Sequence, residues 1–273
     1  MDFTGINVVI TGGSSGIGLA TGVEFARRGA HVGIVGRDPA KLERAAAAIE
    51  QARRSPDQKV LTASADLSGL EPARAAFESF ARQGLVPEIL VNSAGVIIPG
   101  EFESMSPEDF LRNIEHGFLS VVWPCKVVAP QMVAAGRGHI VNVSSAAGFL
   151  GIYGYSSYAA AKYAVMGFSE ALRFEMKPAG VDVHVVCPPD TDTPALDYEK
   201  TLRPRETEAI SGNIKAVSPE VVARAIIRGI EKGRHHIFAD STTRFYFRLK
   251  GLLPEVFFWI VDADIRKVRK AAR

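Results

Sequence analysis

Short runs of apolar and β-branched residues alternate with stretches of helical periodicity along most of this chain. The first run covers residues 8–10, the last covers residues 181–186, and a predicted helix follows nearly every run. Two parallel strands need a long crossover connection, usually a helix, so this alternation predicts a mostly parallel sheet with helices on both faces. Since no internal repeat or low-complexity linker interrupts the 273 residues, we expect a single domain with a doubly wound, Rossmann-type α/β fold.

The predicted elements follow from the period of the apolar residues and from the helix start and stop signals. The strands are expected at residues 8–10, 31–35, 60–63, 89–91, 139–143 and 181–186. The helices are expected at residues 20–28, 39–53, 72–83, 107–135, 155–177 and 219–232.

The pattern changes after the last predicted strand, where residues 189–215 form a polar segment rich in Thr, Glu and Arg. A long irregular segment after the carboxyl end of a strand is typical of a lid or a binding loop, with disorder as the alternative. Ser218 and Pro219 then supply an N-cap and a first-turn proline for the next helix. We therefore expect the segment to cover a substrate site.

Composition excludes several classes of protein. The net charge is only +2 and the charges are interspersed, which argues against a nucleic-acid surface. Cys125 and Cys187 lie in apolar segments without a Cys/His cluster, so we expect buried thiols rather than a metal site or a disulfide. The adjacent His235 and His236 are expected to face solvent or lie in a strand. The N-terminus shows no secretory pattern, and a cytoplasmic location is expected.

The C-terminal segment 241–273 is set apart by an apolar stretch at residues 252–261 and a basic tail. The stretch is too short to span a bilayer, and Pro254 and Glu255 interrupt it. Two interpretations remain open. The segment lies in a membrane interface with its basic residues against anionic headgroups, or it forms a helix packed on the core or on a dimer partner. The basic residues are Arg266, Lys267, Arg269, Lys270 and Arg273.

A glycine-rich loop at residues 11–18 follows the first predicted strand and opens a helix, which is the context of a dinucleotide-binding fingerprint. Its glycines allow a tight turn and a close backbone approach, so that amide N–H groups can face a pyrophosphate. The candidate residues of this loop are Gly12, Ser14, Ser15, Gly16, Ile17 and Gly18.

The second predicted strand ends in residues that favour NADPH over NADH. An acid about 20 residues beyond the glycine loop usually accepts the 2′-hydroxyl of NAD, whereas here Arg37 follows the strand and Lys41 lies one helical turn further. A guanidinium fork suits a 2′-phosphate. The alternative is that Arg37 is a solvated cation and that Asp38 acts as the acid.

Tyr158 and Lys162 lie four residues apart in a predicted helix, which places a phenol and an ammonium on one face. A nearby cation lowers the pKa of a phenol, and such a pair can exchange a proton with a reacting oxygen. The spacing alone is common on solvated helices, so its significance depends on the other motifs.

Together with the glycine loop, the residues Asn92-Ser-Ala-Gly95, Ser145, Tyr158 and Lys162 resemble the short-chain dehydrogenase/reductase family over residues 5 to 195. The resemblance implies that Tyr158 is the general acid and that Lys162 lowers its pKa and binds the nicotinamide ribose. It also implies that Ser145 donates a hydrogen bond to the carbonyl oxygen, with Ser144 as the substitute if the register slips by one.

The resemblance also implies a set of further cofactor contacts. They fall at the adenine, at the adenosine ribose, and at the carboxamide and phosphates. These residues are Asp66, Leu67, Asn92, Gly95, Pro188, Thr191 and Thr193. Residues 1–240 would form the NADP-binding reductase domain, including the substrate loop 189–215, and no metal is expected.

Two departures from the family pattern stand out. Most members have Pro-Gly where this chain has Pro188-Pro189, and many have a relay asparagine where this chain has Gly117. Asn113, one turn earlier, is either an offset substitute or a surface residue.

The implied activity is the NADPH-dependent reduction of a carbonyl. The unusual residues 188–194 and the apolar C-terminus favour a long-chain 3-keto lipid substrate, and another hydrophobic ketone or alcohol, such as a steroid, a retinoid or a 3-oxoacyl chain, is the alternative. A cofactor-binding sensor without catalysis is a third hypothesis, disfavoured by the retention of the catalytic trio. The family further implies a homodimer or homotetramer formed through the helices near 107–135 and 155–177, where Phe118, Val122, Phe168 and Leu172 are candidate contacts.

Overall fold

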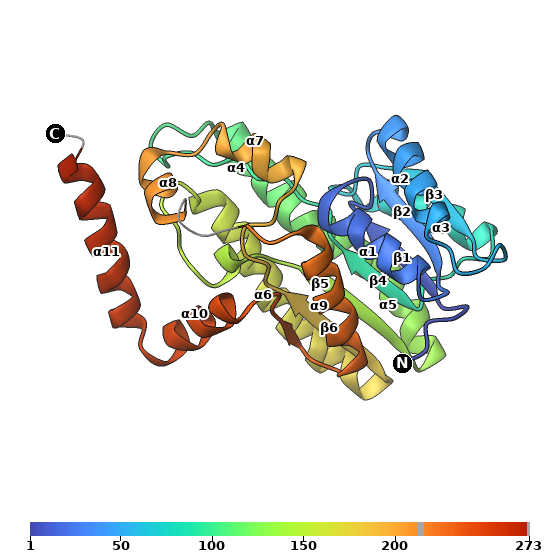
Figure 1. The fold of residues 1–273 in the computed structure, drawn as a ribbon. Helices are drawn as coiled ribbons and strands as arrows, with labels where there is room; N and C mark the ends of the chain where they lie inside the picture. Colours follow the sequence, from blue (N-terminus) through green and yellow to red (C-terminus); the bar gives the residue numbers. More distant parts are fainter. Residues whose placement is uncertain (212–215, 272–273) are drawn as a thin grey trace.

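A single seven-stranded parallel sheet lies between two layers of helices in the computed structural model, which describes residues 1–211 and 216–271 (Figure 1). The strand order is β3-β2-β1-β4-β5-β6-β7. The strands are β1 (Asn7–Thr11), β2 (His31–Gly36), β3 (Val60–Ser64), β4 (Ile89–Asn92), β5 (Gly138–Val143), β6 (Val181–Val186) and β7 (His236–Ile237). The predicted doubly wound fold and all the predicted strands are confirmed. The two-residue β7 was not predicted as a strand of its own, although a strand was one of the two interpretations of His236.

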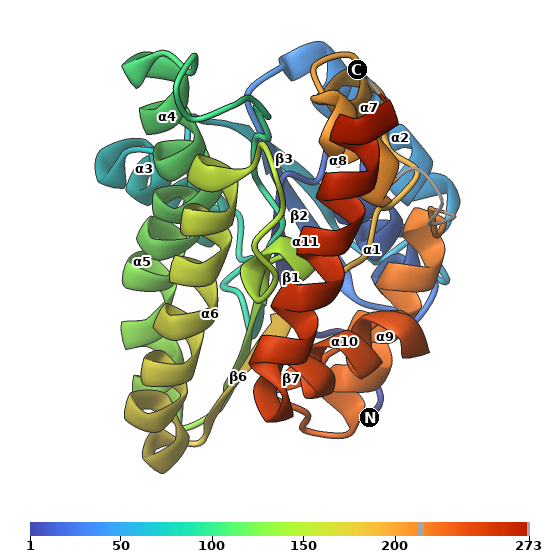
Figure 2. The same cartoon turned by 90° about the vertical axis from the view of Figure 1, so that its left-hand side faces the viewer.

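Each face of the sheet has its own hydrophobic core because successive strand residues point to opposite sides. Val8 and Ile10 of β1 pack into one cluster, and Val9 between them packs into the other. The first face is covered by α1 (Gly16–Ala26), α2 (Pro39–Gln51) and α9 (Pro219–Glu231). The second is covered by α3 (Leu70–Arg82), α5 (Ser120–Ala135) and α6 (Ser156–Met176), as Figure 2 shows.

The predicted helix at 107–135 consists of three parts: α4 (Pro107–Ile114), a π-helical turn at Glu115–Leu119, and α5. Among the described residues this helix, Pro107–Ala135, is the one long and apolar enough to cross a membrane by length and composition alone. Its α5 part contacts α3 and buries Val121, Val128 and Met132 in the second core. Packing within the protomer therefore accounts for part of its apolar sequence, since 33% of the apolar window is buried.

The polar segment after β6 is more regular than predicted. It contains α7 (Pro194–Lys200) and α8 (Arg205–Ser211), so the expectation of an irregular loop is wrong for the described part, and residues 212–215 lie outside it. Thr193 caps α7 by accepting a hydrogen bond from the Leu196 N–H at 3.2 Å, and Pro194 starts the helix. These helices are too short and polar to show an apolar period.

The C-terminal segment forms α10 (Ser241–Leu252) and α11 (Pro254–Ala271), which Figure 1 shows at the edge of the molecule. Pro254 begins α11 rather than interrupting a helix. Phe257 is buried, α11 contacts α8, and the Lys250 ammonium donates a hydrogen bond to the Phe149 carbonyl at 2.5 Å. The segment is thus packed against the body in part. Arg273 and the side chains of Arg269 and Lys270 lie outside the described residues.

Two single turns of 3-10 helix complete the described fold, at Ala146–Gly148 and Lys177–Ala179.

Candidate active site

Two adjoining cavities open at the carboxyl ends of the central strands. One has a volume of about 320 Å³ and extends from the glycine loop to the end of β2, and the other has about 180 Å³ and lies between Ser145, Tyr158 and α7. Ligands of open α/β sheets bind at this edge, where the direction of winding changes. The cavities share part of their walls, so a molecule in one can reach the other. The shared residues are Ile17, Ser93, Gly95, Val96, Thr193 and Ala195.

The glycine loop between β1 and α1 is shaped by contacts that exclude side chains. A Cβ on Gly12 would lie 2.7 Å from the Ala94 nitrogen, and one on Gly18 would lie 2.3 Å from the Gly12 carbonyl oxygen. Gly16 has φ +53°, which only glycine adopts without strain. Ser15 stands at the N-cap of α1 without a side-chain capping bond, which leaves the first amides of the helix facing the cavity. This arrangement fits a pyrophosphate.

At the far end of the larger cavity, Arg37 and Lys41 lie on its wall. Asp38 also lines the cavity, but its Oδ1 accepts a hydrogen bond from the Lys41 N–H at 3.1 Å and caps α2. This capping bond occupies one of the two oxygens of the carboxylate. The groups named for the 2′ position, the cations Arg37 and Lys41 and the acid Asp38, thus all lie at this end of the cavity.

Most of the predicted cofactor residues line one cavity or the other. The larger contains Gly12, Ser14, Ser15, Gly16, Ile17, Arg37, Lys41, Asp66, Leu67, Gly95 and Thr193. The smaller contains Lys162, Tyr158, Pro188, Thr191 and the predicted hydrogen-bond donor Ser145.

Gly18 and Asn92 are among the lining residues of neither cavity. Gly18 packs against Gly12, which lets α1 approach β1 closely. Asn92 is buried at the end of β4, donates a hydrogen bond to the Asn142 Oδ1 at 2.9 Å, and has its own Oδ1 unpaired. Their role in cofactor binding remains a prediction.

Lys162 is buried beside Tyr158, and its ammonium lies 5.7 Å from the centre of the tyrosine ring. It donates a hydrogen bond to the Val143 carbonyl at 3.2 Å, which holds it at the end of β5. Burial lowers the pKa of Lys162 to about 8, because a cation is poorly solvated there.

The lowering of the Tyr158 pKa by Lys162, which the family resemblance implies, stays a prediction. Burial raises the pKa of the Tyr158 phenol, a hydrogen bond with Ser145 opposes the shift, and the charges of Glu199 and Asp190 add to it. The phenol therefore holds its proton more firmly than a free tyrosine.

Ser144 and Ser145 have different partners. The Ser144 hydroxyl donates to the Lys162 carbonyl at 2.9 Å and is buried, so it fixes α6 to β5. The Ser145 Oγ accepts a hydrogen bond from the Ala147 N–H at 3.1 Å and lines the smaller cavity, where it interacts with Tyr158. The geometry favours Ser145 over the substitute.

The π-helical turn contains Gly117, the position of the family's relay asparagine. A Cβ there would lie 3.0 Å from the Ala161 Cβ, so a side chain at this position would require α6 to shift by a few tenths of an ångström. Asn113 is buried rather than exposed, which corrects the surface interpretation. Its side-chain amide accepts a hydrogen bond from the Ile98 N–H at 3.0 Å. The same amide donates to the Ile98 carbonyl at 2.9 Å and to the Ser157 hydroxyl at 2.8 Å.

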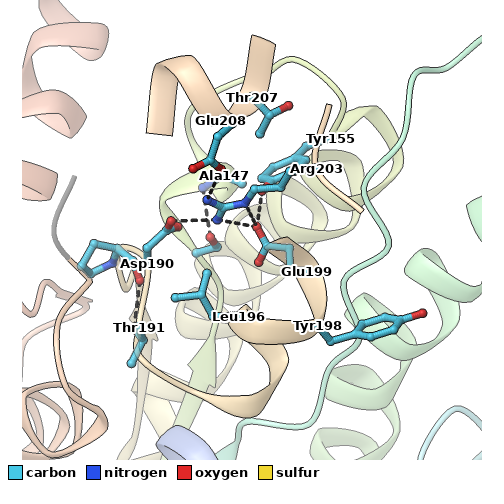
Figure 3. A network of polar contacts seen from close by, with 12 residues as sticks. Ala147, Tyr155, Asp190, Thr191, Leu196, Tyr198, Glu199, Arg203, Thr207 and Glu208 are labelled. Atoms are coloured by element: carbon cyan, nitrogen blue, oxygen red, sulfur yellow. Dashed lines mark hydrogen bonds and ion pairs between the residues drawn. The ribbon is translucent and has the colours of Figure 1, made fainter. Parts of the chain in front are cut away.

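A polar network in the smaller cavity was missed by the sequence reasoning. Figure 3 shows the Arg203 guanidinium between the carboxylates of Asp190 and Glu199, with the Tyr155 hydroxyl donating to Glu199. The spacing of Glu199 and Arg203, four residues apart, was a usable signal for a helical ion pair. The spacing did not show that Glu199 lines the same cavity as Ser145 and Tyr158.

Comparisons with known proteins agree with this geometry. The family model described as short chain dehydrogenase matches residues 7–203. A protein of Bos taurus named 3-ketodihydrosphingosine reductase is 38% identical over 230 residues, covering 84% of this chain and 69% of its own. One of Dictyostelium discoideum with the same name is 35% identical over 272 residues, covering 94% and 81%.

Among solved structures, a short chain dehydrogenase/reductase from Burkholderia phymatum in complex with NAD has a TM-score of 0.83 at 25% identity, covering 94% of this chain and 96% of its own. A short-chain dehydrogenase from Sphingobium yanoikuyae in complex with NADPH has a TM-score of 0.77 at 28% identity, covering 92% and 94%. The chain therefore belongs to the short-chain dehydrogenase/reductase family and is an oxidoreductase with a nicotinamide cofactor.

Proposed function

We propose that this enzyme uses NADPH to reduce 3-ketodihydrosphingosine to dihydrosphingosine, a step of sphingolipid synthesis. The observation that carries the proposal is the likeness to reductases of that name from a mammal and an amoeba, which extends over 84% and 94% of this chain. The family's catalytic residues Ser145, Tyr158 and Lys162 line one cavity beside the cofactor cavity, in agreement with this activity.

The side chains of the smaller cavity suit carbonyl reduction. A bound nicotinamide dinucleotide supplies the hydride and leaves negative charge to develop on the substrate oxygen. Tyr158 then donates its proton to that oxygen and Ser145 donates a hydrogen bond, since both hydroxyls face the same cavity. The raised pKa of Tyr158 keeps the phenol protonated before the reaction. Lys162, whose ammonium donates to the Val143 carbonyl, would hold the nicotinamide ribose.

The preference for NADPH is supported by the end of β2. Arg37 and Lys41 face the cavity, and the Asp38 carboxylate accepts the capping bond of α2. The fold does not determine which of the two cofactors is bound, because one of the related structures holds NAD and the other holds NADPH.

The test is NADPH oxidation by the purified protein with 3-ketodihydrosphingosine in mixed micelles. We expect turnover, and we expect Tyr158→Phe to lower kcat by about 10²- to 10⁴-fold, because the variant lacks the donated proton. Binding of NADPH to the variant, followed by fluorescence, should be retained and serves as its control. Turnover of a steroid, retinoid or 3-oxoacyl substrate in place of the keto-sphingoid base would contradict the assigned substrate. Unchanged turnover in Tyr158→Phe would show that Tyr158 is not the proton donor, and a wild type that turns over no carbonyl substrate would favour the sensor hypothesis.

We also propose that the enzyme works in the cytoplasm, peripherally bound to a membrane through α10 and α11, and that it forms a homodimer or homotetramer. The exposed apolar residues near Pro254 support the membrane contact. Phe118, Phe168 and Val122 are half-buried in the protomer, which leaves part of each side chain for an oligomer contact, whereas Leu172 is buried within the protomer. Light scattering measures the oligomeric state.

A further inference from the structure

The smaller cavity contains two carboxylates that the reaction chemistry described above does not use. Asp190 lies after β6, where it follows the two prolines, and Glu199 lies on α7. Both line the cavity together with Tyr158 and Ser145. Neither carboxylate is needed to deliver a proton or to polarise a carbonyl, so their presence calls for a separate explanation.

Both carboxylates are held in place by one guanidinium. The Arg203 Nη2 lies 2.7 Å from the Asp190 Oδ2 and 2.5 Å from the Glu199 Oε1, and the Arg203 Nε donates to the same Glu199 oxygen at 2.7 Å (Figure 3). The Tyr155 hydroxyl donates to this oxygen as well. Within the described part of the chain, the hydrogen bonds and ion pairs of Glu199 use Oε1, so Oε2 is the oxygen available to a ligand.

The network carries an excess of negative charge. Arg203 is the one cation in contact with Asp190, Glu199 and Glu208 among the described residues, and its side chain is 2% exposed. The Glu199 side chain is 8% exposed, and burial raises the pKa of its carboxyl, whereas the hydrogen bond from Tyr155 and the charge of Arg203 oppose that shift. A second cation beside these carboxylates would offset the desolvation of the excess charge.

The two carboxylates lie close enough to the catalytic tyrosine to influence the pKa of its phenol. Glu199 and Asp190 both raise the pKa of Tyr158, and the rings of Tyr155 and Tyr158 lie 5.8 Å apart. A cationic group bound by them would therefore lie next to a carbonyl that accepts the Tyr158 proton.

We propose that Asp190 and Glu199 bind an ammonium group on the carbon adjacent to the reacting carbonyl, and that Arg203 positions the two carboxylates. This inference rests on the proposed function, since 3-ketodihydrosphingosine is 2-amino-1-hydroxyoctadecan-3-one. Its amine is on the carbon next to the carbonyl carbon, so the ammonium must enter the cavity together with the carbonyl. Charge pairing at this position distinguishes the amino ketone from neutral lipid ketones of similar length.

The same contacts also tie the segment around α7 and α8 to the body of the protein, so a test must separate substrate recognition from folding. Asp190→Asn and Glu199→Gln keep the shape of each side chain and remove its charge. Glu208→Gln is the matched control, because Glu208 contacts the same Arg203 at 3.8 Å but is 58% exposed and is not among the residues that line the cavity.

The experiment compares kcat/KM for 3-ketodihydrosphingosine and for its des-amino analogue, 1-hydroxyoctadecan-3-one, in the wild type and the three variants. We expect Asp190→Asn and Glu199→Gln each to lose about 10- to 100-fold on the amino ketone, chiefly through KM, because each removes a charge-assisted contact. In the same two variants, kcat/KM for the des-amino ketone should stay within about threefold of the wild-type value, because this substrate has no ammonium for either carboxylate to bind. Glu208→Gln should resemble the wild type on both ketones, and all variants should bind NADPH normally.

Equal losses on both ketones would overturn the inference and leave the network with a structural role. So would a wild type that uses both ketones equally well. A wild type that turns over neither long-chain ketone contradicts the proposed function instead. In that case the comparison is made with aminoacetone against hydroxyacetone, where equal kcat/KM values refute the ammonium site and a preference for aminoacetone that Glu199→Gln abolishes supports it.

Discussion

Lys162 shows how far a side chain's neighbours determine its chemistry. The pair of Tyr158 and Lys162 was recognisable from its spacing, but the carbonyl of Val143 and the cavity around the pair decide what each group does. Burial lowers the pKa of Lys162 to about 8 and raises that of Tyr158. Both shifts bring the pair toward neutral forms, a consequence of desolvation that no sequence motif contains.

Arg37 is the residue on which the cofactor preference depends most. Replacing it in Arg37→Ser should lower kcat/KM for NADPH by about 10- to 100-fold, because a guanidinium that pairs with a 2′-phosphate is lost, and should leave kcat/KM for NADH within about threefold. Steady-state kinetics with both cofactors measure this. Arg44→Ser is the control, since Arg44 is exposed on α2 and is not among the residues that line the cavity. If NADH and NADPH were affected alike, the preference would have to come from another residue.

At the scale of the elements, β5 and β6 carry an acid-sensitive histidine pair. His184 is buried on β6, its Nδ1 lies 2.6 Å from the Arg234 carbonyl oxygen, and its Nε2 lies 3.2 Å from the His139 Nδ1 on β5. Burial lowers the pKa of His184 to about 4, a hydrogen bond to Arg234 and the charge of Asp182 oppose this, and the neighbouring histidines add to it.

The folded protein therefore holds His184 neutral, while the unfolded chain takes up a proton below pH 6.5. The free energy of unfolding should fall as the pH drops from 6.5 to about 4, by on the order of 3 kcal/mol from this group, and the contribution should level off below that pH. Denaturant unfolding at a series of pH values measures the slope. In His184→Gln the slope in this window should shrink, and an unchanged slope would assign the effect to other groups.

The elements differ in how well their sequences predict them. The strands at residues 8–10 and 181–186 are recognisable because buried parallel strands are continuous β-branched runs. The helices α7 and α8 are not, since they depend on local capping by Thr193 and on the contacts of Arg203 rather than on an apolar period. The π-helical turn was not predicted either, and its Gly117 lies against Ala161 of α6, which is a tertiary contact.

The same distinction applies to the site. The glycine loop has a recognisable context between a strand and a helix, and Tyr158 and Lys162 share a face of α6, whereas Ser145, which follows β5, was named from the family resemblance. The acidic pair of the smaller cavity was not predictable, because Asp190 and Glu199 come from a loop and a short helix that meet only in the folded protein. A cluster formed by such segments carries no periodic signal.

At the scale of the whole molecule, exposed apolar residues gather where α10 ends and α11 begins. We call this group the C-terminal apolar surface, and it consists of exposed side chains, namely Leu252, Leu253, Val256, Phe258, Trp259 and Ile260. Trp259 is 67% exposed and Leu252 is 80% exposed, while Arg266 and Lys267 are exposed further along α11. Helix α11 contacts α8, which follows α7 in the chain, and α7 contributes Leu196 and Glu199 to the wall of the smaller cavity.

The proposed membrane contact predicts that this surface carries binding to lipid vesicles. The double variant Phe258→Ser, Trp259→Ser should lower the fraction of protein that sediments with anionic vesicles by about tenfold, because two aromatic side chains no longer enter the interface. Binding of the wild type should also weaken at high salt, since the basic residues of α11 act through long-range charge.

Phe174→Ser is the matched control, because Phe174 is 64% exposed on α6, away from the C-terminal apolar surface, and its loss should leave sedimentation unchanged. The double variant should keep the wild-type kcat on a short soluble ketone, since both side chains lie on α11 and neither is among the residues that line the smaller cavity. Equal sedimentation of wild type and double variant would contradict the membrane contact. A change in molar mass by light scattering in the double variant alone would instead assign this surface to a second copy of the chain.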